Sequence, residues 1–459
     1  MPLLGWAVAA GITIGVLFAA SPLSVVTVAG AAALIVFAGR DLATDERRRI
    51  VSILCAALAV RFILIGVMLI INIPGLSDLG IGGLRGDDAY YLGRAIRARD
   101  IILGLTRGRY DYFVVFDEYG RTSYLQLLTV LQVLFGPTPY SMRVFNSLLF
   151  VTASYLLFRL CRPSLGATAT TMALLALVSL PSLLASSIST SKEPLYFLIT
   201  TVLLTSAVAV IRRPGLTAKL WPIAIAAACL WVLDDLRRGA LALSIAGLVL
   251  AAIARVMFVT PRRAIAAITV TLAVSVILLT QPAIQQRLLD ATASAAKMHA
   301  GHVFTSGHAY KLLDEGFYMH PGTPAAWLLE LTDRQAGRFL VRAAISFVVT
   351  PLPWEMISRS ELVFFPEHLL WLAIVLFIPI GAAVGWRRDA TITACLIGFA
   401  LPTAAVLAVT TGNVGTLLRL RGLVTPYLLW FAVLGALAVA ERLLSRPAPR
   451  SIRHAEAGS

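Results

Sequence analysis

Charged residues are scarce in this chain of 459 residues. Asp, Glu, Lys and Arg make up 14% of it, whereas soluble domains carry about 25%. Hydrophobic residues make up 58%, and the mean hydropathy is +0.83. A chain this apolar cannot bury all its apolar surface in one soluble core, so we expect an integral membrane protein. Apolar runs of about 20 residues, the length of a spanning helix, recur, and strand-like alternation over such lengths is absent.

Several motifs of other protein classes are also missing. The four cysteines lie far apart and form no CxxC pair, so they indicate neither a zinc site nor a disulfide framework. No HExxH pattern and no P-loop occur, which argues against a zinc hydrolase and against ATP-driven transport by this chain alone. The formal charge of +15 sits in short clusters between apolar runs, without a basic stripe, which argues against a nucleic-acid partner.

The basic clusters predict the topology. The loop 40–49, which contains Arg47, Arg48 and Arg49, is expected to be cytoplasmic by the positive-inside rule, and so is the N-terminus. The first residues lack a positive n-region, so we expect the first span to be retained. We expect an all-α polytopic protein with about twelve transmembrane helices and both termini inside, spanning 3–20, 22–39, 50–72, 140–160, 165–187, 193–211, 219–235, 239–258, 263–281, 366–386, 390–410 and 422–442.

Two long segments, 73–138 and 282–365, then fall on the extracytoplasmic side. Each contains a short apolar stretch, 123–135 and 339–349, which suits a helix at the membrane surface better than a span. Counting 123–135 as a span would place the later basic loops outside. The chain thus divides into an N-terminal hairpin with its loop (1–49), a transmembrane domain (50–444) and a cytoplasmic tail (445–459).

An acidic and aromatic stretch, Gly86 to Tyr91, follows the third expected span on the outer side. Asp87 or Asp88 can act there as a general base, or both can hold a divalent cation, Mg²⁺ or Mn²⁺, against a phosphate-bearing donor. The alternative is a solvated loop with an Asx turn after Gly86. Tyr90 and Tyr91 could stack on a sugar or anchor in the headgroup layer.

Three short outer turns carry cations, which the positive-inside rule disfavours in short outer loops. The cations, with one asparagine beside them, are Lys192, Arg237, Arg238, Asn413, Arg419 and Arg421. Arginine binds phosphate oxygens in a bidentate manner, so convergence of these turns would create an anion site at the membrane surface. The alternative is local pairing, of Lys192 with Glu193 and of the 237–238 arginines with Asp234 and Asp235.

The layout resembles the GT-C superfamily of membrane glycosyltransferases, closest to the protein mannosyltransferase and aminoarabinose transferase branch (glycosyltransferase family 39-like). The resemblance covers roughly residues 50–440. The matching residues are Asp87-Asp88-Ala89-Tyr90-Tyr91, Phe135-Gly136-Pro137-Thr138-Pro139 with Arg143, Pro181, Ser191-Lys192-Glu193-Pro194-Leu195, the Pro-Leu-Pro-Trp run at 351–354 and the run 412–421.

This resemblance implies a transferase of the cytoplasmic membrane with its active face outside. It would move a sugar from a polyprenyl-phosphate-linked donor to a cell-envelope glycan, lipid or protein, as in polysaccharide biosynthesis. Asp87 or Asp88 would be the base or metal ligand, with a preference for Asp87. The predicted donor-phosphate ligands are Arg237, Arg238, Arg419, Arg421 and Lys192, and the predicted substrate contacts are Tyr90, Tyr91 and Asn413.

The chain departs from the family pattern by two additional spans at the front and by the absence of a large soluble C-terminal domain. Acceptor recognition would therefore fall to the outer loops. Two alternatives stay open: a lipid-linked oligosaccharide flippase or other transporter, and a non-catalytic subunit of a cell-envelope assembly complex.

Overall fold

The fold is built from helices. The structure is a computed structural model, and among the residues it describes no strand occurs, only an isolated bridge between Ala309 and Asn413. The expected first span, 3–20, lies largely outside the described part, as do the side chains of Asp87 and Asp88 and the tail from residue 446. The described residues are 8, 11–15, 18, 21–71, 86–105, 108–116, 122–137, 139–305, 308–318, 331–352, 354 and 359–445.

Nine helices in the described ranges are long and apolar enough to cross a membrane. A tenth span is possible if α8 (Ala167–Ser179) and α9 (Pro181–Ser187), which meet at a 62° bend, are counted together. The nine are α3 (Thr44–Ile71), α7 (Pro139–Leu165), α10 (Glu193–Arg212), α11 (Leu216–Leu236), α12 (Ala240–Met257), α13 (Pro261–Leu279), α16 (Arg359–Arg388), α17 (Ala390–Thr410) and α19 (Thr425–Leu444).

The structure supports a polytopic membrane protein without confirming a count of twelve. The second expected span corresponds to α2 (Pro22–Phe37), which has 16 residues. At 1.5 Å per residue it is about 24 Å long, short of the roughly 30 Å hydrocarbon layer. The fifth expected span, 165–187, is the bent pair α8–α9, because Pro181 cannot continue the helix that precedes it.

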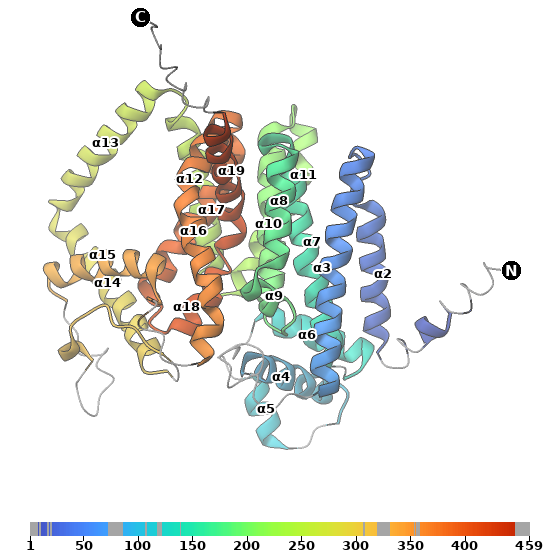
Figure 1. The fold of residues 1–459 in the computed structure, drawn as a ribbon. Helices are drawn as coiled ribbons and strands as arrows, with labels where there is room; N and C mark the ends of the chain where they lie inside the picture. The colour runs from blue at the N-terminus through green and yellow to red at the C-terminus, as the bar shows by residue number, and fades with distance from the viewer. Residues whose placement is uncertain are drawn as a thin grey trace, which may run out of the picture.

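The spans stand side by side, and shorter helices gather at one end of the bundle (Figure 1). We call this the α6 end, and it carries α9 together with the shorter helices, whose bounds are α4 (Gly86–Ile102), α5 (Arg109–Phe116), α6 (Ser123–Phe135), α14 (Pro282–Val303), α15 (Asp333–Val349) and α18 (Val414–Arg421).

Three sequence expectations fall on the α6 end. The 123–135 stretch is α6, which lies across the direction of the spans, and 339–349 is the later part of α15, which also lies across them (Figure 1). The alternative of a solvated loop with an Asx turn after Gly86 is wrong, because residues 86–91 form the first turns of α4. Asp87 and Asp88 therefore start a helix.

Ion pairs join the helices at the opposite end. Arg162 of α7 forms a fork with both carboxylate oxygens of Glu46, at 2.6 Å each. Asp389, before α17, accepts from Ser164 Oγ at 2.5 Å and pairs with Arg212. Burial opposes the charged form of Asp389, but these bonds, backbone N–H groups and the Arg212 charge lower the pKa of its carboxyl. The ends of α3, α7, α10 and α17 are thereby tied together.

Glycines allow α16 and α19 to touch backbone to backbone. A Cβ on Gly381 would lie 1.7 Å from the carbonyl oxygen of Phe431, and one on Gly435 would lie 2.2 Å from that of Phe377. Small residues commonly permit such close approach between membrane helices. Because Gly381 and Gly435 have no Cβ, α19 can pack directly against α16, and this close contact fixes the register between the two helices.

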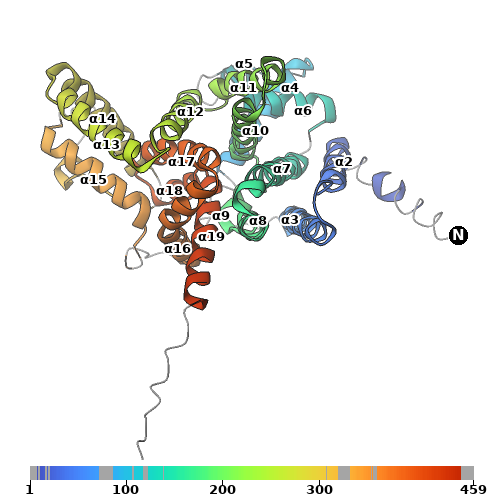
Figure 2. The same ribbon diagram turned by 90° about the horizontal axis from the view of Figure 1, so that it is seen from above.

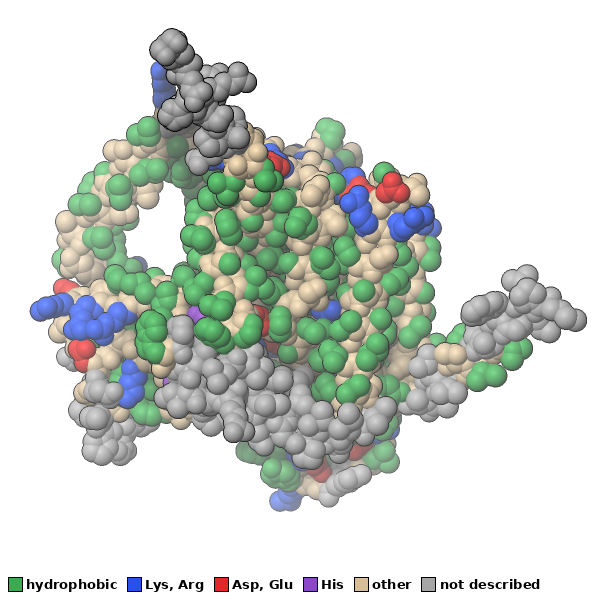
Figure 3. All heavy atoms as spheres, viewed as in Figure 1, with side chains coloured by type: hydrophobic (Ala, Val, Ile, Leu, Met, Phe, Trp, Pro, Cys, Tyr) green, Lys and Arg blue, Asp and Glu red, His purple; other side chains and the backbone are tan. Residues whose placement is uncertain are grey.

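Helix α13 stands apart from the bundle (Figure 2). None of its most apolar 18-residue window is buried. In the space-filling view an opening separates it from the remaining spans, and apolar side chains cover the helix (Figure 3). Such all-round apolar exposure is what lipid contact predicts for a spanning helix.

Candidate functional site

Cations from three separate turns meet at one carboxylate at the α6 end. Glu193 begins α10, and its Oε1 lies 3.8 Å from Nη1 of Arg237, which follows α11. Arg419 of α18 and Lys192 also act electrostatically on this carboxylate. We call these four residues the cationic cluster. Three positively charged side chains thus act on one carboxylate.

Partial burial strengthens the electrostatics of the cluster. The side chain of Glu193 is 11% exposed and that of Arg237 is 22% exposed. Charges withdrawn from water in this way interact more strongly than charges on an open surface. A ligand anion that entered the cluster would therefore meet poorly screened positive charge.

The first turns of α4 lie beside the cluster. Nζ of Lys192 lies 6.0 Å from the ring centroid of Tyr91, within the range of a cation–π contact. The buried Tyr91 ring packs edge-on against Tyr90 and Tyr124, with centroids 5.5 Å apart in both cases. Position 87 lies one turn before Tyr91 in α4. The start of α4, which includes residues 87 and 88, thus approaches the turn that carries Lys192 through the Tyr91 ring.

The turn before Lys192 is held from the interior. The fully buried Asn146 of α7 donates through Nδ2 to the carbonyls at both ends of the turn 189–191, at 2.7 and 2.8 Å. The hydroxyl of Tyr124 donates to the carbonyl between them at 2.9 Å. Since a buried turn has no helical partners for its carbonyls, these bonds determine its shape. They fix the point from which Lys192 and Glu193 emerge.

The same turn follows the half-helix α9. An ionisable residue holds each end of this helix. Glu367 of α16 accepts from the backbone N–H of Ser182 at 2.9 Å, in the first turn of α9. Arg61 of α3 donates through Nε to Oγ of Ser187, the last residue of α9, at 2.8 Å. A carboxylate suits the N-terminal end of a helix dipole and a cation suits the C-terminal end. These two residues stand inside apolar spans, where charge is costly, and they position α9.

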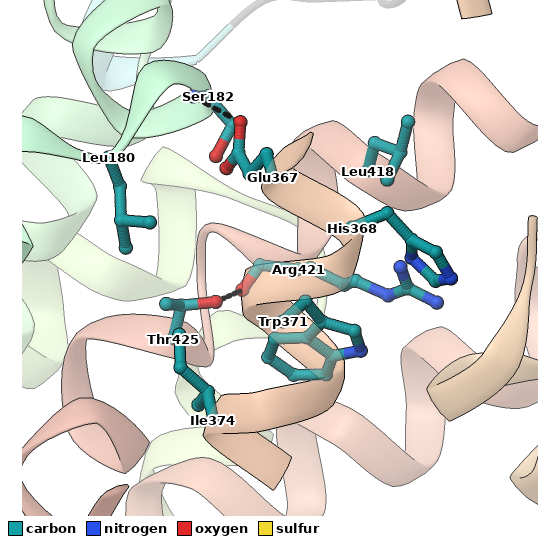
Figure 4. Close-up of a pocket in the computed structure, with 9 residues that line it drawn as sticks. All are labelled: Leu180, Ser182, Glu367, His368, Trp371, Ile374, Leu418, Arg421 and Thr425. Atoms are coloured by element: carbon teal, nitrogen blue, oxygen red, sulfur yellow. Dashed lines mark hydrogen bonds between the residues drawn. The ribbon is translucent and has the colours of Figure 1, made fainter. Parts of the chain in front are cut away.

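A small cavity lies between α9, α16, α18 and α19 (Figure 4). Its polar lining includes Glu367, His368 and Arg421, and the close-up shows the His368 ring beside the guanidinium of Arg421. Its volume is about 30 Å³, far below the roughly 300–1,000 Å³ of sites that bind drug-sized ligands. We therefore do not assign a substrate to this cavity.

Arg421 caps a helix and is not among the charges that act on Glu193. It donates to the carbonyl of Phe347 through Nε at 3.0 Å and Nη2 at 2.5 Å, and to the carbonyl of Thr350 at 2.5 Å. These are C-terminal carbonyls of α15, where a cation is favourable. Burial lowers the pKa of Arg421 to about 9, which leaves it charged at neutral pH. Its hydrogen bonds give it a structural role.

Asn413 and its surroundings are likewise engaged in structure. The Oδ1 of Asn413 accepts from the backbone N–H of Thr416 at 3.2 Å and so caps α18. Just before it, the carbonyl of Thr411 lies 2.7 Å from Nδ1 of His299 and 2.5 Å from the hydroxyl of Tyr310. Burial lowers the pKa of His299 to about 4, so the ring is neutral at pH 7. The run that leads into α18 is therefore anchored to α14.

Of the five predicted cations, the fold gathers three: Lys192, Arg237 and Arg419. Arg238 is exposed, as are Asp234 and Asp235. The alternative of Arg237 pairing within its own turn is replaced by a pairing across to α10.

Sequence reasoning missed the residues that support the site. It treated Glu193 only as a local partner of Lys192, and it did not single out Asn146, Arg61 or Glu367. A signal was present for two of them, because an ionisable residue inside an apolar run is rare unless it has a function or a partner. For Asn146 the sequence carries no comparable signal.

Comparison with protein-family models, with curated proteins and with solved structures finds no match for this chain. Among the described side chains no group of three His, Cys, Asp or Glu residues could hold a metal ion. The side chains of Asp87 and Asp88 lie outside that set, so a divalent cation held by them stays a prediction.

Proposed function

We propose that this protein is a membrane glycosyltransferase that moves a sugar from a polyprenyl-phosphate-linked donor to an extracytoplasmic acceptor. The observation that supports the proposal is the cationic cluster, in which three turns distant in sequence bring Lys192, Arg237 and Arg419 to Glu193 beside the start of α4. A lipid phosphate carries the negative charge that this group of cations would bind.

The reaction follows from these roles. The acceptor hydroxyl oxygen attacks the anomeric carbon of the donor, the bond from that carbon to the phosphate oxygen breaks, and its electron pair leaves with the phosphate. Asp87 or Asp88 accepts the proton of the hydroxyl, as a general base does. The cationic cluster stabilises the charge that develops on the departing phosphate, which lowers the barrier. A divalent cation held by Asp87 and Asp88 would serve the same end.

The proposed orientation places the α6 end outside the cytoplasmic membrane. The positive-inside distribution supports this, since Arg162, Arg212 and Arg388 lie at the opposite end, and Arg262 and Arg263 begin α13 there (Figure 1). An extracytoplasmic face suits an acceptor in the cell envelope, such as a glycan, a lipid or a protein.

The test uses single substitutions, Asp87→Asn and Asp88→Asn, with membranes supplied with labelled polyprenyl-phosphate sugars. We expect one of them, with Asp87 preferred, to reduce transfer at least 100-fold, the usual contribution of a general base. Arg263→Gln, an exposed charge change at the start of α13, is the matched control. Full transfer activity in both aspartate variants would refute the assignment.

A transporter of lipid-linked oligosaccharides is the second candidate, because one feature favours it. Arg61 of α3 and Glu367 of α16 hold α9, the short half of the bent pair α8–α9. Broken helices with ionisable partners are typical of transporters. Proteoliposomes that contain the protein and a fluorescent lipid-linked saccharide distinguish the two. Movement of the lipid across the bilayer without sugar transfer would favour the transporter.

A further inference from the structure

A second hollow lies against α15, away from the cationic cluster. Its volume is about 250 Å³, and it is formed by α15 and the segment 313–317. We call it the α15 pocket. Helix α15 lies at the α6 end (Figure 1), and Lys and Arg side chains gather over α14 and α15 in the space-filling view (Figure 3). The pocket therefore opens in a region of positive charge.

The charges in the α15 pocket do not balance. Arg338 makes a two-pronged contact with Asp314, with both nitrogen–oxygen distances at 3.2 Å. Nη1 of Arg342 lies 3.7 Å from Asp314 Oδ1 and donates to the carbonyl of Leu312 at 3.0 Å. Among the lining side chains that the structure describes, two positive charges thus share one negative charge. A guanidinium has five N–H donors, so each arginine keeps donors for a ligand.

The lining of the pocket suits a sugar ring. The volume of about 250 Å³ has room for such a ligand and lies just below the roughly 300–1,000 Å³ of sites for drug-sized ligands. Phe317 supplies an apolar wall, while Gln335 and Asp314 supply groups that can bond to hydroxyls. A ligand that matches all of these has an apolar ring face, several hydroxyls and one negative charge.

The carboxylate of Asp314 argues for a sugar acid over a phosphate headgroup. Inorganic phosphate or a phosphate monoester carries about −1.5 to −2 charge at neutral pH, more than a carboxylate, so Asp314, whose carboxylate faces the same hollow as the two arginines, would repel it more strongly. A sugar acid can place its carboxylate on the surplus guanidinium and donate a hydroxyl to Asp314.

We propose that the α15 pocket binds a carboxylate-bearing sugar unit of an acidic glycan. Such a ligand would be the acceptor of the transfer reaction, and that role rests on the proposed function, whereas binding itself does not. The acceptor would then be recognised by a part of the protein that contributes none of the residues of the cationic cluster.

The experiment uses the full chain in nanodiscs of phosphatidylcholine, with D-glucuronate, D-glucose and inorganic phosphate as probes in titrations followed by ligand-detected NMR. We expect glucuronate to bind about tenfold more tightly than glucose, the worth of one charge-assisted hydrogen bond. Arg338→Gln and Arg342→Gln should each weaken glucuronate binding about tenfold. Arg334→Gln removes one exposed charge from the same helix outside the pocket, and we expect a change below about twofold.

Three results would overturn the proposal. The first is that the wild-type protein does not bind glucuronate. The second is that the Arg334 variant loses as much glucuronate affinity as the pocket variants. The third is that phosphate binds as tightly as glucuronate. Arg338→Lys keeps the charge but loses the two-pronged guanidinium. Weaker glucuronate binding by this variant, at an unchanged melting temperature, supports a direct contact between the guanidinium and the ligand. Glucuronate binding without any sugar transfer would count against the proposed function and leave the pocket assignment intact.

Discussion

The charge balance of the cationic cluster predicts opposite effects for two conservative substitutions. Glu193→Gln removes its negative charge, and Arg237→Gln removes a cation 3.8 Å away. Two unit charges at this distance interact by about 4 kcal/mol at an effective dielectric constant of about 20, which is an upper bound. Because Arg237 is 22% exposed, screening reduces the effect to about 1–2 kcal/mol. Glu193→Gln should therefore tighten binding of a lipid phosphate about 5- to 30-fold, and Arg237→Gln should weaken it similarly.

The assay titrates polyprenyl phosphate into the protein in phosphatidylcholine nanodiscs at fixed ionic strength. Arg263→Gln serves as a control for general charge effects, since this residue is exposed at the start of α13. The opposite signs are the decisive feature. If both substitutions weaken binding, the Glu193–Arg237 pair acts as a structural ion pair, and the predicted effect of its charges on phosphate affinity is wrong.

Three further predictions concern stability. Arg421→Gln leaves the C-terminal carbonyls of α15 without their buried donor, so we expect a loss of about 1–3 kcal/mol and faster amide exchange in α15. Unchanged exchange would contradict the capping role. Gly381→Ala would place a Cβ 1.7 Å from the Phe431 carbonyl oxygen and should lower the melting temperature, whereas Gly66→Ala, with nothing within 4 Å, should not. His299 has a folded pKa of about 4, below the usual 6.5, so the unfolded chain takes up its proton first as the pH falls. Stability should therefore drop between pH 6.5 and 4 by up to about 3 kcal/mol, and His299→Asn should lack this part of the pH dependence in chemical unfolding.

The proposed function and the α15 pocket assign different tasks to two parts of the α6 end. The cationic cluster is formed by α10, α18 and the turns beside them, whereas the α15 pocket is formed by α15 and the segment before it. Donor and acceptor would be bound by separate elements. Substitutions in one part should therefore change the affinity for one substrate and leave the other affinity unchanged.

Residues 86–91 show how far local pattern reasoning reaches. Their position after an apolar run was readable from the sequence, and so was their acidic and aromatic character. Their helical conformation was not, since Gly86 with two aspartates is also typical of a turn. The length of 123–135, in contrast, was enough to predict a short helix, and α6 has these bounds.

The sequence by itself determined the class of protein, because hydropathy and the placement of basic residues act through the bilayer and need no knowledge of packing. Tertiary structure alone decided which of the predicted cations belong together. Arg419 and Arg421 lie two residues apart, yet one acts on Glu193 and the other caps α15, since residues two apart on a helix face different sides. Lys192 and Arg237 come from separate turns, and both act on Glu193. Asn146 and the half-helix α9 hold the turn 189–191, from which Lys192 and Glu193 emerge. Such contacts depend on distance in space, which spacing along a chain does not encode.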